Sequence, residues 1–309
     1  MEFKHQSVLV KEVLEYLPPR GASLGPKNGG IFVDGTLGGG GHTLAIANKF
    51  KNQNLKFKII GIDRDLEAIF AAKKNLSEYQ NRVTFIHDNY SNIPKILESQ
   101  GIDRINFILL DLGVSSYQLN NPERGFTFQS DSALDMRMNQ KDEQTAADIV
   151  NFYPEKDLAS IFYEYGGERN SRKIAKNIVI ERKKKKITTT SELSRVVEKS
   201  FPVNYSGKYK IHPATRVFQA LRIETNNELN ILKEFISKAA KLLAGDGRLA
   251  IISFHSGEDR IVKHSFRELE KNNKDQYKVL TKKPVVAGDE ELKVNPRSRS
   301  AKLRILERI

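Results

Sequence analysis

Two aspartates and a run of glycines carry the clearest chemistry in this chain. Asp34 closes the apolar run 31–33, Gly38–Gly41 follow within a few residues, and Asp63 closes a second apolar run. Glycines let a backbone approach a ligand closely and tolerate positive φ angles. Asp63 lies 23 residues beyond Gly40, near the spacing of roughly 20 at which an acid binds ribose hydroxyls in nucleotide-binding α/β folds. The pattern predicts a nucleotide-like ligand at the carboxyl end of the first strand.

The charges around the loop indicate which nucleotide binds. A dinucleotide fingerprint, Gly-x-Gly-x-x-Gly, fails because Gly38 and Gly40 fit but Thr43 holds the last position. Asp34 and Asp111 would repel a pyrophosphate and attract a cation. S-adenosylmethionine carries a positive ammonium and a positive sulfonium and no phosphate, so we expect it as the cofactor. The alternative is that the glycines only make a tight turn and the acids cap helices.

Composition excludes several other chemistries. The chain has no cysteine among its 309 residues, which excludes disulfides, thiolate metal sites and thiol nucleophiles. Cytosine carbon-5 methylation through a Cys nucleophile and zinc-dependent base deamination are excluded with them. The six His residues show no ligand spacing, so we expect no metal. The net charge of +13 favours a polyanionic partner such as RNA, DNA or an anionic membrane, although a lysine-rich solvated surface would give the same charge.

The sequence also bears on location. Residues 1–6 lack the long apolar stretch of a signal peptide, and no run approaches the ~18 apolar residues of a membrane span. We therefore expect a cytoplasmic protein without membrane contact.

Strand and helix patterns alternate in the segments that position the acids. Strands are predicted at 31–34, 57–63, 83–86 and 107–111, and helices begin near 42, 66 and 93. From about Gln118 to Ile211 only amphipathic segments occur, at 146–152, 157–165, 173–180 and 191–201. Alternation resumes with a helical stripe at 229–243, a turn at 245–247, strands at 249–254, 277–280 and 302–306, and a helix at 261–269. We predict an α/β core of residues 1–117 and 213–309, interrupted by an inserted helical domain at 118–212.

Several separate motifs extend this pattern. They are His5–Leu9, Asp34–His42, Ile62–Asp65, Leu110–Ser116, Glu123–Phe128, Leu134–Met138, Tyr165–Arg169, His212–Ile223, Ser253–Ser256 and Asn295–Arg304. On these motifs, over almost its whole length, the chain closely resembles the bacterial family of ribosomal RNA small-subunit (cytosine-N4)-methyltransferases. It departs from that family at Gly257, where Leu is usual, and in the segment 21–30, which is longer and richer in glycine.

The resemblance implies a Rossmann-like, class I S-adenosylmethionine-dependent methyltransferase core with a substrate-recognition insertion after the fourth strand. It also implies transfer of a methyl group to N4 of a cytidine in the decoding region of 16S ribosomal RNA. The partner is this RNA, and the sequence leaves open whether it is bound free or within the small ribosomal subunit. The implied cofactor contacts are Gly40, Gly41, His42, Asp63, Tyr90, Asp111 and Gln118. Of these, Tyr90 and Gln118 rest on the resemblance alone.

The acceptor amine requires activation because its lone pair is conjugated into the cytosine ring. Many amino-methyltransferases place Asp or Asn before Pro-Pro and an aromatic residue after the fourth strand. This chain keeps only the leading polar residue, Asp111. We expect Asp111 or nearby loop carbonyls to polarise the amine, with Asn226 or His255 as further catalytic candidates. His255 is equally well explained as a structural histidine.

Two basic clusters are candidates for RNA binding. Residues 172–186 hold eight basic side chains and one acid, and a second cluster comprises Arg297, Arg299, Lys302, Arg304 and Arg308. We expect phosphate contacts from Arg172, Lys173, Lys176, Arg297 and Arg299. For Lys183–Lys186 alone a solvated face is favoured. Phe126, Phe128 and Tyr165 are candidates for stacking on a flipped base, although aromatic rings more often belong to the core.

Two other functions remain open at this point. One is a methyltransferase of the same fold that acts on another nucleic acid or on protein. The other is a nucleotide-sensing RNA-binding module without catalysis, which the intact glycine loop and Asp63 disfavour.

Overall fold

The computed structural model of the chain describes residues 7–18, 30–202 and 211–309. The chain divides into two compact units, one formed by residues 1–115 and 229–309 and the other by residues 116–228. The motif residues His5 and Gln6, and the glycine-rich segment up to residue 29, lie outside the described residues. Within the described ranges, no helix has both the length and the apolar character that a membrane span needs.

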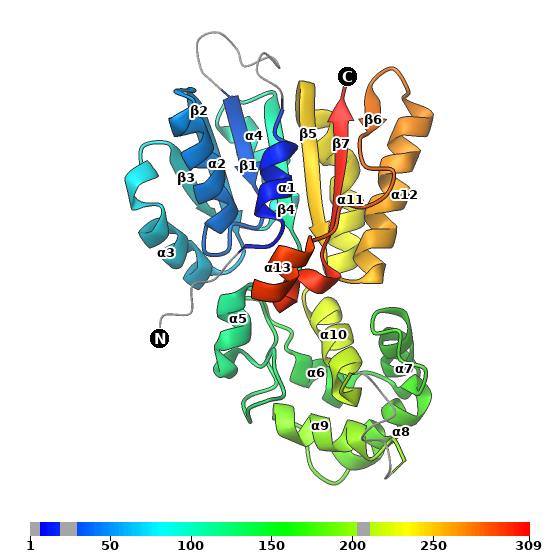
Figure 1. Cartoon of the computed structure of the whole chain (residues 1–309). Helices are drawn as coiled ribbons and strands as arrows, with labels where there is room; N and C mark the ends of the chain where they lie inside the picture. Colours follow the sequence, from blue (N-terminus) through cyan, green and yellow to red (C-terminus); the bar gives the residue numbers. More distant parts are fainter. Residues whose placement is uncertain (1–6, 19–29, 203–210) are drawn as a thin grey trace. The chain divides into compact units, whose positions relative to one another are not determined.

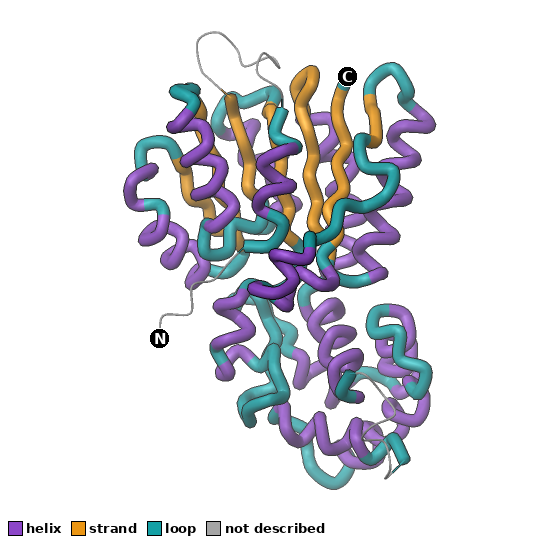
Figure 2. The backbone as a smooth tube through the Cα atoms, viewed as in Figure 1, coloured by secondary structure: helices purple, strands orange, loops and turns teal. Residues whose placement is uncertain are grey.

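A seven-stranded sheet forms the centre of the first unit (Figures 1 and 2). The strands found in the described part of this unit are β1 (Gly30–Asp34), β2 (Phe57–Asp63), β3 (Val83–His87), β4 (Ile105–Asp111), β5 (Leu243–Ser253), β6 (Tyr277–Val279) and β7 (Lys302–Arg308). Their spatial order is β3-β2-β1-β4-β5-β7-β6, with β1 to β5 parallel and β7 antiparallel to both neighbours. This architecture confirms the predicted Rossmann-like methyltransferase core.

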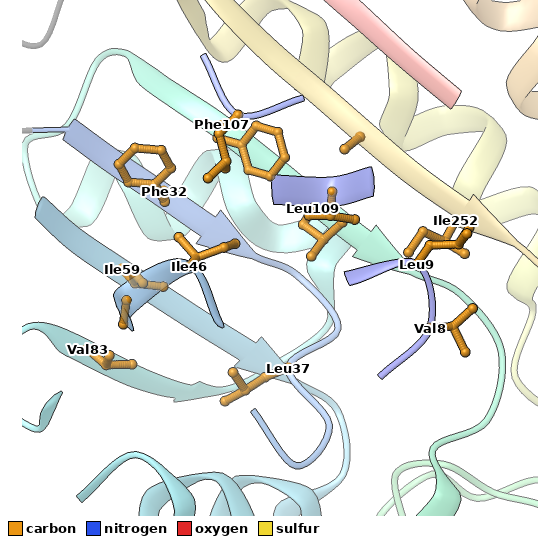
Figure 3. Close-up of a cluster of buried hydrophobic side chains, with 14 of the residues drawn as sticks. Val8, Leu9, Phe32, Leu37, Ile46, Ile59, Val83, Phe107, Leu109 and Ile252 are labelled. Carbon is orange, nitrogen blue, oxygen red and sulfur yellow. The ribbon is translucent and has the colours of Figure 1, made fainter. Parts of the chain in front are cut away.

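Helices cover both faces of this sheet. The helices of the unit are α1 (Val10–Glu15), α2 (Gly41–Asn52), α3 (Leu66–Asn75), α4 (Ile93–Ser99), α11 (Glu228–Leu242), α12 (Ser256–Asn272) and α13 (Asp289–Val294), with short 3-10 turns η1 (Ser77–Tyr79), η2 (Tyr90–Asn92) and η5 (Pro296–Ser300). One apolar cluster packs α1, α2 and α3 on the sheet, and a second packs α4, α11 and α12 on the other face. In Figure 3, Val8 and Leu9 of the N-terminal segment lie beside Ile252 of β5 within the first cluster. The N-terminal segment is therefore part of the core.

The predicted strands are present, with one local difference. The predicted turn at 245–247 lies inside β5, whose pairing with β4 shifts between Ile105–Leu243 and Phe107–Arg248. Between these two pairs β5 advances by five residues while β4 advances by two, so β5 contains a bulge. Asp246 lies in this bulge and takes a φ of +59°. Turn-forming residues in the sequence do not distinguish a loop from a bulge, because both need the same backbone angles.

The second unit is helical. Its described elements are α5 (Ser116–Asn120), η3 (Pro122–Arg124), α6 (Ala146–Phe152), α7 (Glu155–Glu164), α8 (Ser171–Arg182), α9 (Thr190–Glu198) and α10 (Pro213–Thr225). It begins at residue 116 and ends at 228, whereas the expected insertion spans 118–212. The difference is α10, which packs against α6, α7 and α9 rather than on the sheet. An apolar stripe predicts a helix but not the partner that buries it.

Candidate functional site

Three aspartates end neighbouring parallel strands at one edge of the sheet. Asp34 closes β1, Asp63 closes β2 and Asp111 closes β4. In the sheet register, Asp34 lies opposite Gly61 of β2 and Leu109 of β4. Ligands of open α/β sheets bind at the carboxyl ends of the strands, beside the point where the strand order reverses. The predicted gathering of these acids at the cofactor edge is therefore present.

The glycine loop is held against the second strand. The Gly38 amide donates to Oδ2 of Asp63 at 2.7 Å, and the Leu37 amide donates to the Ile62 carbonyl at 2.9 Å. Gly40 has a φ of +81° at the start of α2, and a Cβ there would lie 2.8 Å from Cδ1 of Leu76. A side chain at this position would therefore strain the backbone and displace either Leu76 or the loop.

Asp63 is arranged to accept further hydrogen bonds. Its Oδ1 accepts the Asp65 amide at 2.9 Å, and its Oδ2 accepts the Gly38 amide at 2.7 Å. Burial raises the pKa of Asp63 to about 6, although these two backbone bonds act in the opposite direction. Each carboxylate oxygen has more than one acceptor position, so the group can still receive a pair of hydroxyls. This is the donor–acceptor match that a ribose diol needs.

Asp34 is turned inward and shapes the loop. It is 3% exposed, and its Oδ2 accepts the Thr43 hydroxyl at 2.7 Å. Burial raises the pKa of Asp34 to about 6. Asp34 thus ties the start of α2 to the end of β1.

Asp111 has a carboxylate oxygen that is buried and without a hydrogen bond among the described residues, Oδ1. Its other oxygen, Oδ2, lies 3.7 Å from Nδ1 of His42. Burial raises the pKa of Asp111 to about 7, and the charge of Glu258 adds to this effect. A buried acceptor without a donor is costly. The position therefore fits a cationic or hydrogen-bond-donating ligand group.

The N-terminal segment contacts the ring nitrogen of His42 that does not face Asp111. Nε2 of His42 lies 2.8 Å from the Val8 carbonyl, and the Leu9 amide donates to Oε1 of Glu291 at 2.9 Å. Leu9 has a φ of +56° and is fully buried. At Gly41, the hydroxyl of Ser7 occupies the place where a Cβ would stand. Residues 7–9 therefore pack against the glycine loop and help to fix its conformation, a role that the sequence analysis did not predict.

Tyr90 begins η2 directly after β3, and its ring is 9% exposed. The ring packs edge-on against Phe235 with centroids 5.1 Å apart. Its contact with an adenine stays a prediction.

His255 is the N-cap of α12. Its Nδ1 accepts the Gly257 amide at 3.2 Å, and its Nε2 lies 3.2 Å from Oε1 of Glu258. Oε2 of Glu258 in turn accepts the His255 amide at 3.3 Å, which completes a capping box, and it also accepts the Phe254 amide at 2.8 Å. The cap bond at Nδ1 favours the structural explanation of His255, but Nε2 is buried without a hydrogen bond among the described residues, and the catalytic role stays a prediction. Sequence reasoning missed Glu258, although its spacing of three residues from the cap was a usable signal.

Gly257 fits this cap. A Cβ at residue 257 would lie 3.1 Å from both Nδ1 and Cε1 of His255, so a larger residue requires the imidazole to shift. Glycine at this position, where the family usually has Leu, therefore leaves the His255 ring room to cap α12.

Asn226 and Gln118 belong to the second unit. Asn226 is the C-cap of α10; its Oδ1 accepts the Met138 amide and its Nδ2 donates to the Met136 carbonyl, both at 2.8 Å. These bonds hold a segment in which buried Met136 takes a φ of +61°. Gln118 is buried on α5. The geometry gives Asn226 a clear positioning role, and the assigned catalytic role of Asn226 and cofactor role of Gln118 remain predictions.

The predicted basic residues differ in exposure. Arg172, Lys173 and Lys176 are exposed along α8, and Arg297 and Arg299 are exposed on η5. The wider C-terminal cluster requires a correction. Arg304 is 5% exposed and its Nε donates to Oδ1 of Asp259 at 2.7 Å, so it stabilises the fold and is not a phosphate contact. Charge clustering in the sequence cannot show which cations already have a buried partner.

The candidate stacking rings are mostly packed. Phe126 is 8% exposed. Phe128 stacks on His212 with centroids 4.7 Å apart and meets Phe218 edge-on at 5.0 Å. The core interpretation is favoured for both rings.

Sequence comparisons match this chain along almost its whole length. A model of the MraW methylase family matches residues 2–309. The chain is 49% identical over 306 residues to a Sulfurihydrogenibium protein named ribosomal RNA small subunit methyltransferase H, covering 99% of each chain. It is 47% identical over 322 residues to a protein of that name from Lachnospira eligens, covering 100% of this chain and 99% of the relative. The structure of an rRNA methylase from Streptococcus thermophilus is similar at 12% identity, with a TM-score of 0.45 over 99% of each chain. The chain belongs to the MraW methylase family.

Proposed function

We propose that this protein transfers a methyl group from S-adenosylmethionine to the N4 amine of a cytidine in the decoding region of 16S ribosomal RNA. The observation that carries the proposal concerns Asp111. Its Oδ1 is buried without a hydrogen bond among the described residues, and it lies at the same edge of the sheet as the glycine loop and Asp63. The names of the relatives, which refer to small-subunit ribosomal RNA, support the substrate class.

The cofactor fits the residues of this edge. Gly40, Gly41 and His42 provide a close backbone approach, Asp63 receives the ribose hydroxyls, and Asp111 faces positive charge. Tyr90 and Gln118 complete the set that the family resemblance implies. S-adenosylmethionine supplies the activated methyl group on its sulfonium.

Asp111 is the strongest candidate for activating the amine. A carboxylate oxygen that accepts an N4 hydrogen withdraws the amine lone pair from the ring and directs it toward the methyl carbon. Of the other two catalytic candidates, Asn226 is bonded to the Met136 and Met138 backbone, and His255 caps α12 through Nδ1. Nε2 of His255 is buried without a hydrogen bond among the described residues, so His255 stays the second candidate. Most of the rate then comes from holding donor and acceptor in line.

The RNA contacts are assigned to exposed cations. Arg172, Lys173 and Lys176 on α8, with Arg297 and Arg299 on η5, neutralise phosphates and position the substrate without reading its sequence. The substrate is the small ribosomal subunit, so the enzyme acts in the cytoplasm.

The test is methyl transfer from labelled S-adenosylmethionine to small subunits that lack the modification, followed by digestion and mass spectrometry of nucleosides. The expected product is N4-methylcytidine, absent with Asp63→Ala and with Asp111→Ala. If the labelled RNA carries another methylated nucleoside instead, the acceptor atom is not N4 of cytidine. Label in protein alone, or none despite cofactor binding, would reject RNA as the substrate.

A further inference from the structure

The end of α6 carries the most exposed aromatic ring among the described residues. Phe152 is 65% exposed, whereas most rings of this unit pack inside it. A single exposed apolar side chain is ordinary on a protein surface. The surroundings of Phe152 are what set it apart.

The backbone beneath Phe152 is clamped to the segment that follows α8. The side chain of Asn151 donates to the Ile187 carbonyl at 2.7 Å and accepts the Ile187 amide at 3.0 Å. Arg182 donates from Nη1 to the Val150 carbonyl at 2.7 Å. These three bonds hold the last turn of α6 beside residues 182–187, so the backbone that carries the Phe152 ring is fixed in position.

The clamped segment is the lysine run 183–186. Lys186 places its Nζ 5.3 Å from the centroid of the Phe152 ring. Lys184 pairs with Glu181 at 3.0 Å and Lys185 with Glu192 at 2.6 Å. Within the described residues, Lys183 and Lys186 have no carboxylate within ion-pair distance. Lys183 and Lys186 are therefore the two ammonium groups of this run without an ion-pair partner, although Lys186 lies over the Phe152 ring and its charge lowers the pKa of Asp148.

We propose that Phe152, Lys183 and Lys186 form a binding site for a single-stranded segment of RNA, with a base stacked on the ring and the flanking phosphates on the two ammonium groups. The inference rests on the proposed function, because it names a contact of the same substrate. An aromatic platform bordered by cations is the arrangement that proteins use for unpaired nucleotides. A paired duplex offers phosphates to the lysines but no free base to the ring.

The ring is tested with a series of substitutions. Phe152→Trp keeps a stacking face, Phe152→Leu keeps apolar volume without one, and Phe152→Ala removes both. Binding is measured with a short labelled single-stranded RNA and with a duplex of equal length. Loss of one stacked base lowers affinity by roughly 5- to 100-fold. We expect that loss for the Leu and Ala variants with the single strand only, and near-parental affinity for Trp.

Phe70 provides the matched control. It lies on α3 in the other unit and is 61% exposed. Phe70→Ala is expected to leave the affinity for the single strand unchanged. Equal losses for Phe70→Ala and Phe152→Ala, or no loss for Phe152→Leu and Phe152→Ala, would overturn the stacking site. Failure of the parent protein to bind the single strand would overturn it as well.

The lysines are tested at constant net charge. Lys183→Gln with Lys186→Gln is compared with Lys184→Gln and Lys185→Gln, which removes two ammonium groups that already have partners. Each lost phosphate contact lowers the salt slope of single-strand binding by about 0.7. The first pair should lower the slope by about 1.4 and the second by less. Equal slopes for the two pairs would show that only overall charge matters and would reject the site.

The outcomes separate this inference from the proposed function. If the parent methylates the ribosomal subunit and the Phe152 variants bind and turn over normally, the stacking site is wrong and the function stands. If the variants lose single-strand binding but no methylated nucleoside forms with the parent, the site stands and the proposed reaction is wrong.

Discussion

Nδ1 of His42 lies 3.7 Å from Oδ2 of Asp111, while Nε2 of the same ring lies 2.8 Å from the Val8 carbonyl. A carbonyl only accepts hydrogen bonds, so the proton of the neutral imidazole sits on Nε2 and the Nδ1 lone pair faces the carboxylate. Burial lowers the pKa of His42 and raises that of Asp111 to about 7. Without a cationic ligand, the additional proton of this pair therefore resides on Asp111 below about pH 7.

The first prediction concerns stability and pH. The pKa of Asp111 rises from 3.8 to about 7 on folding, so between these values the folded chain binds more protons than the unfolded chain. Stability from this group is therefore lost as pH rises through that window. Asp111→Asn should have a melting temperature near that of the parent at pH 4 and above it at pH 8, measured without cofactor. The same difference at both pH values would contradict the assignment.

Cofactor binding should release protons. The ammonium and sulfonium of S-adenosylmethionine favour ionised carboxylates, whereas burial raises the pKa of Asp111 to about 7 and that of Asp63 to about 6. Affinity should increase from pH 5 to pH 8. Calorimetry in two buffers of different ionisation enthalpy measures the release, which should fall in Asp111→Asn. A pH-independent affinity would show that these groups are already ionised.

Gly40→Ala should weaken cofactor binding by about tenfold or more, since about 1.4 kcal/mol of lost interaction suffices. Gly40 has a φ of +81° and a Cβ would lie 2.8 Å from Cδ1 of Leu76, so either the buried Leu76 side chain or the loop must shift. Gly101→Ala is the control, because Gly101 has a φ of +65° with no atom within 4 Å of the added Cβ. Both variants should lose about 1–2 kcal/mol of stability through backbone strain. Only Gly40→Ala should change the cofactor dissociation constant; equal binding by both variants would refute the role of the loop.

Neutralising Arg172, Lys173 and Lys176 together should weaken RNA binding and lower its salt slope by roughly 2 to 3, given about 0.7–0.9 per phosphate contact. All three are exposed on α8. The charge-matched control is Lys233→Gln, Lys238→Gln and Lys241→Gln on α11, whose side chains are also exposed. Filter binding over a range of salt concentrations measures both slopes. Identical slopes would mean that net charge, not the α8 surface, attracts the RNA.

Asn226→Ala should destabilise the second unit. The change leaves the buried Met138 amide and Met136 carbonyl without their 2.8 Å partners, at about 1–3 kcal/mol for each unsatisfied group. Urea denaturation measures the loss. A variant as stable as the parent but without activity would instead support a direct catalytic role for Asn226.

The strand-ending acids could be predicted from sequence because each follows an apolar run, and parallel strands bring their carboxyl ends to one edge. The unit against which α10 packs could not be predicted from sequence, because an apolar stripe on a helix does not indicate which partner buries it. Neither could the pairing of Arg304 with Asp259, which depends on residues 45 positions apart meeting across the fold. The spacing of His255 and Glu258 did contain the capping box, but a histidine near a strand end resembles a catalytic group until its partners are known.

The contact between Leu9 and Glu291 has a consequence for how the protein is made. Residues separated by 282 positions brace the glycine loop together, so this brace cannot form until α13 has left the translating ribosome. Chain growth proceeds at about 5–20 residues per second, and strands β1 to β6 emerge earlier than Glu291. The cofactor edge is therefore completed among the last parts of the molecule, and nascent chains shorter than this point should not retain cofactor.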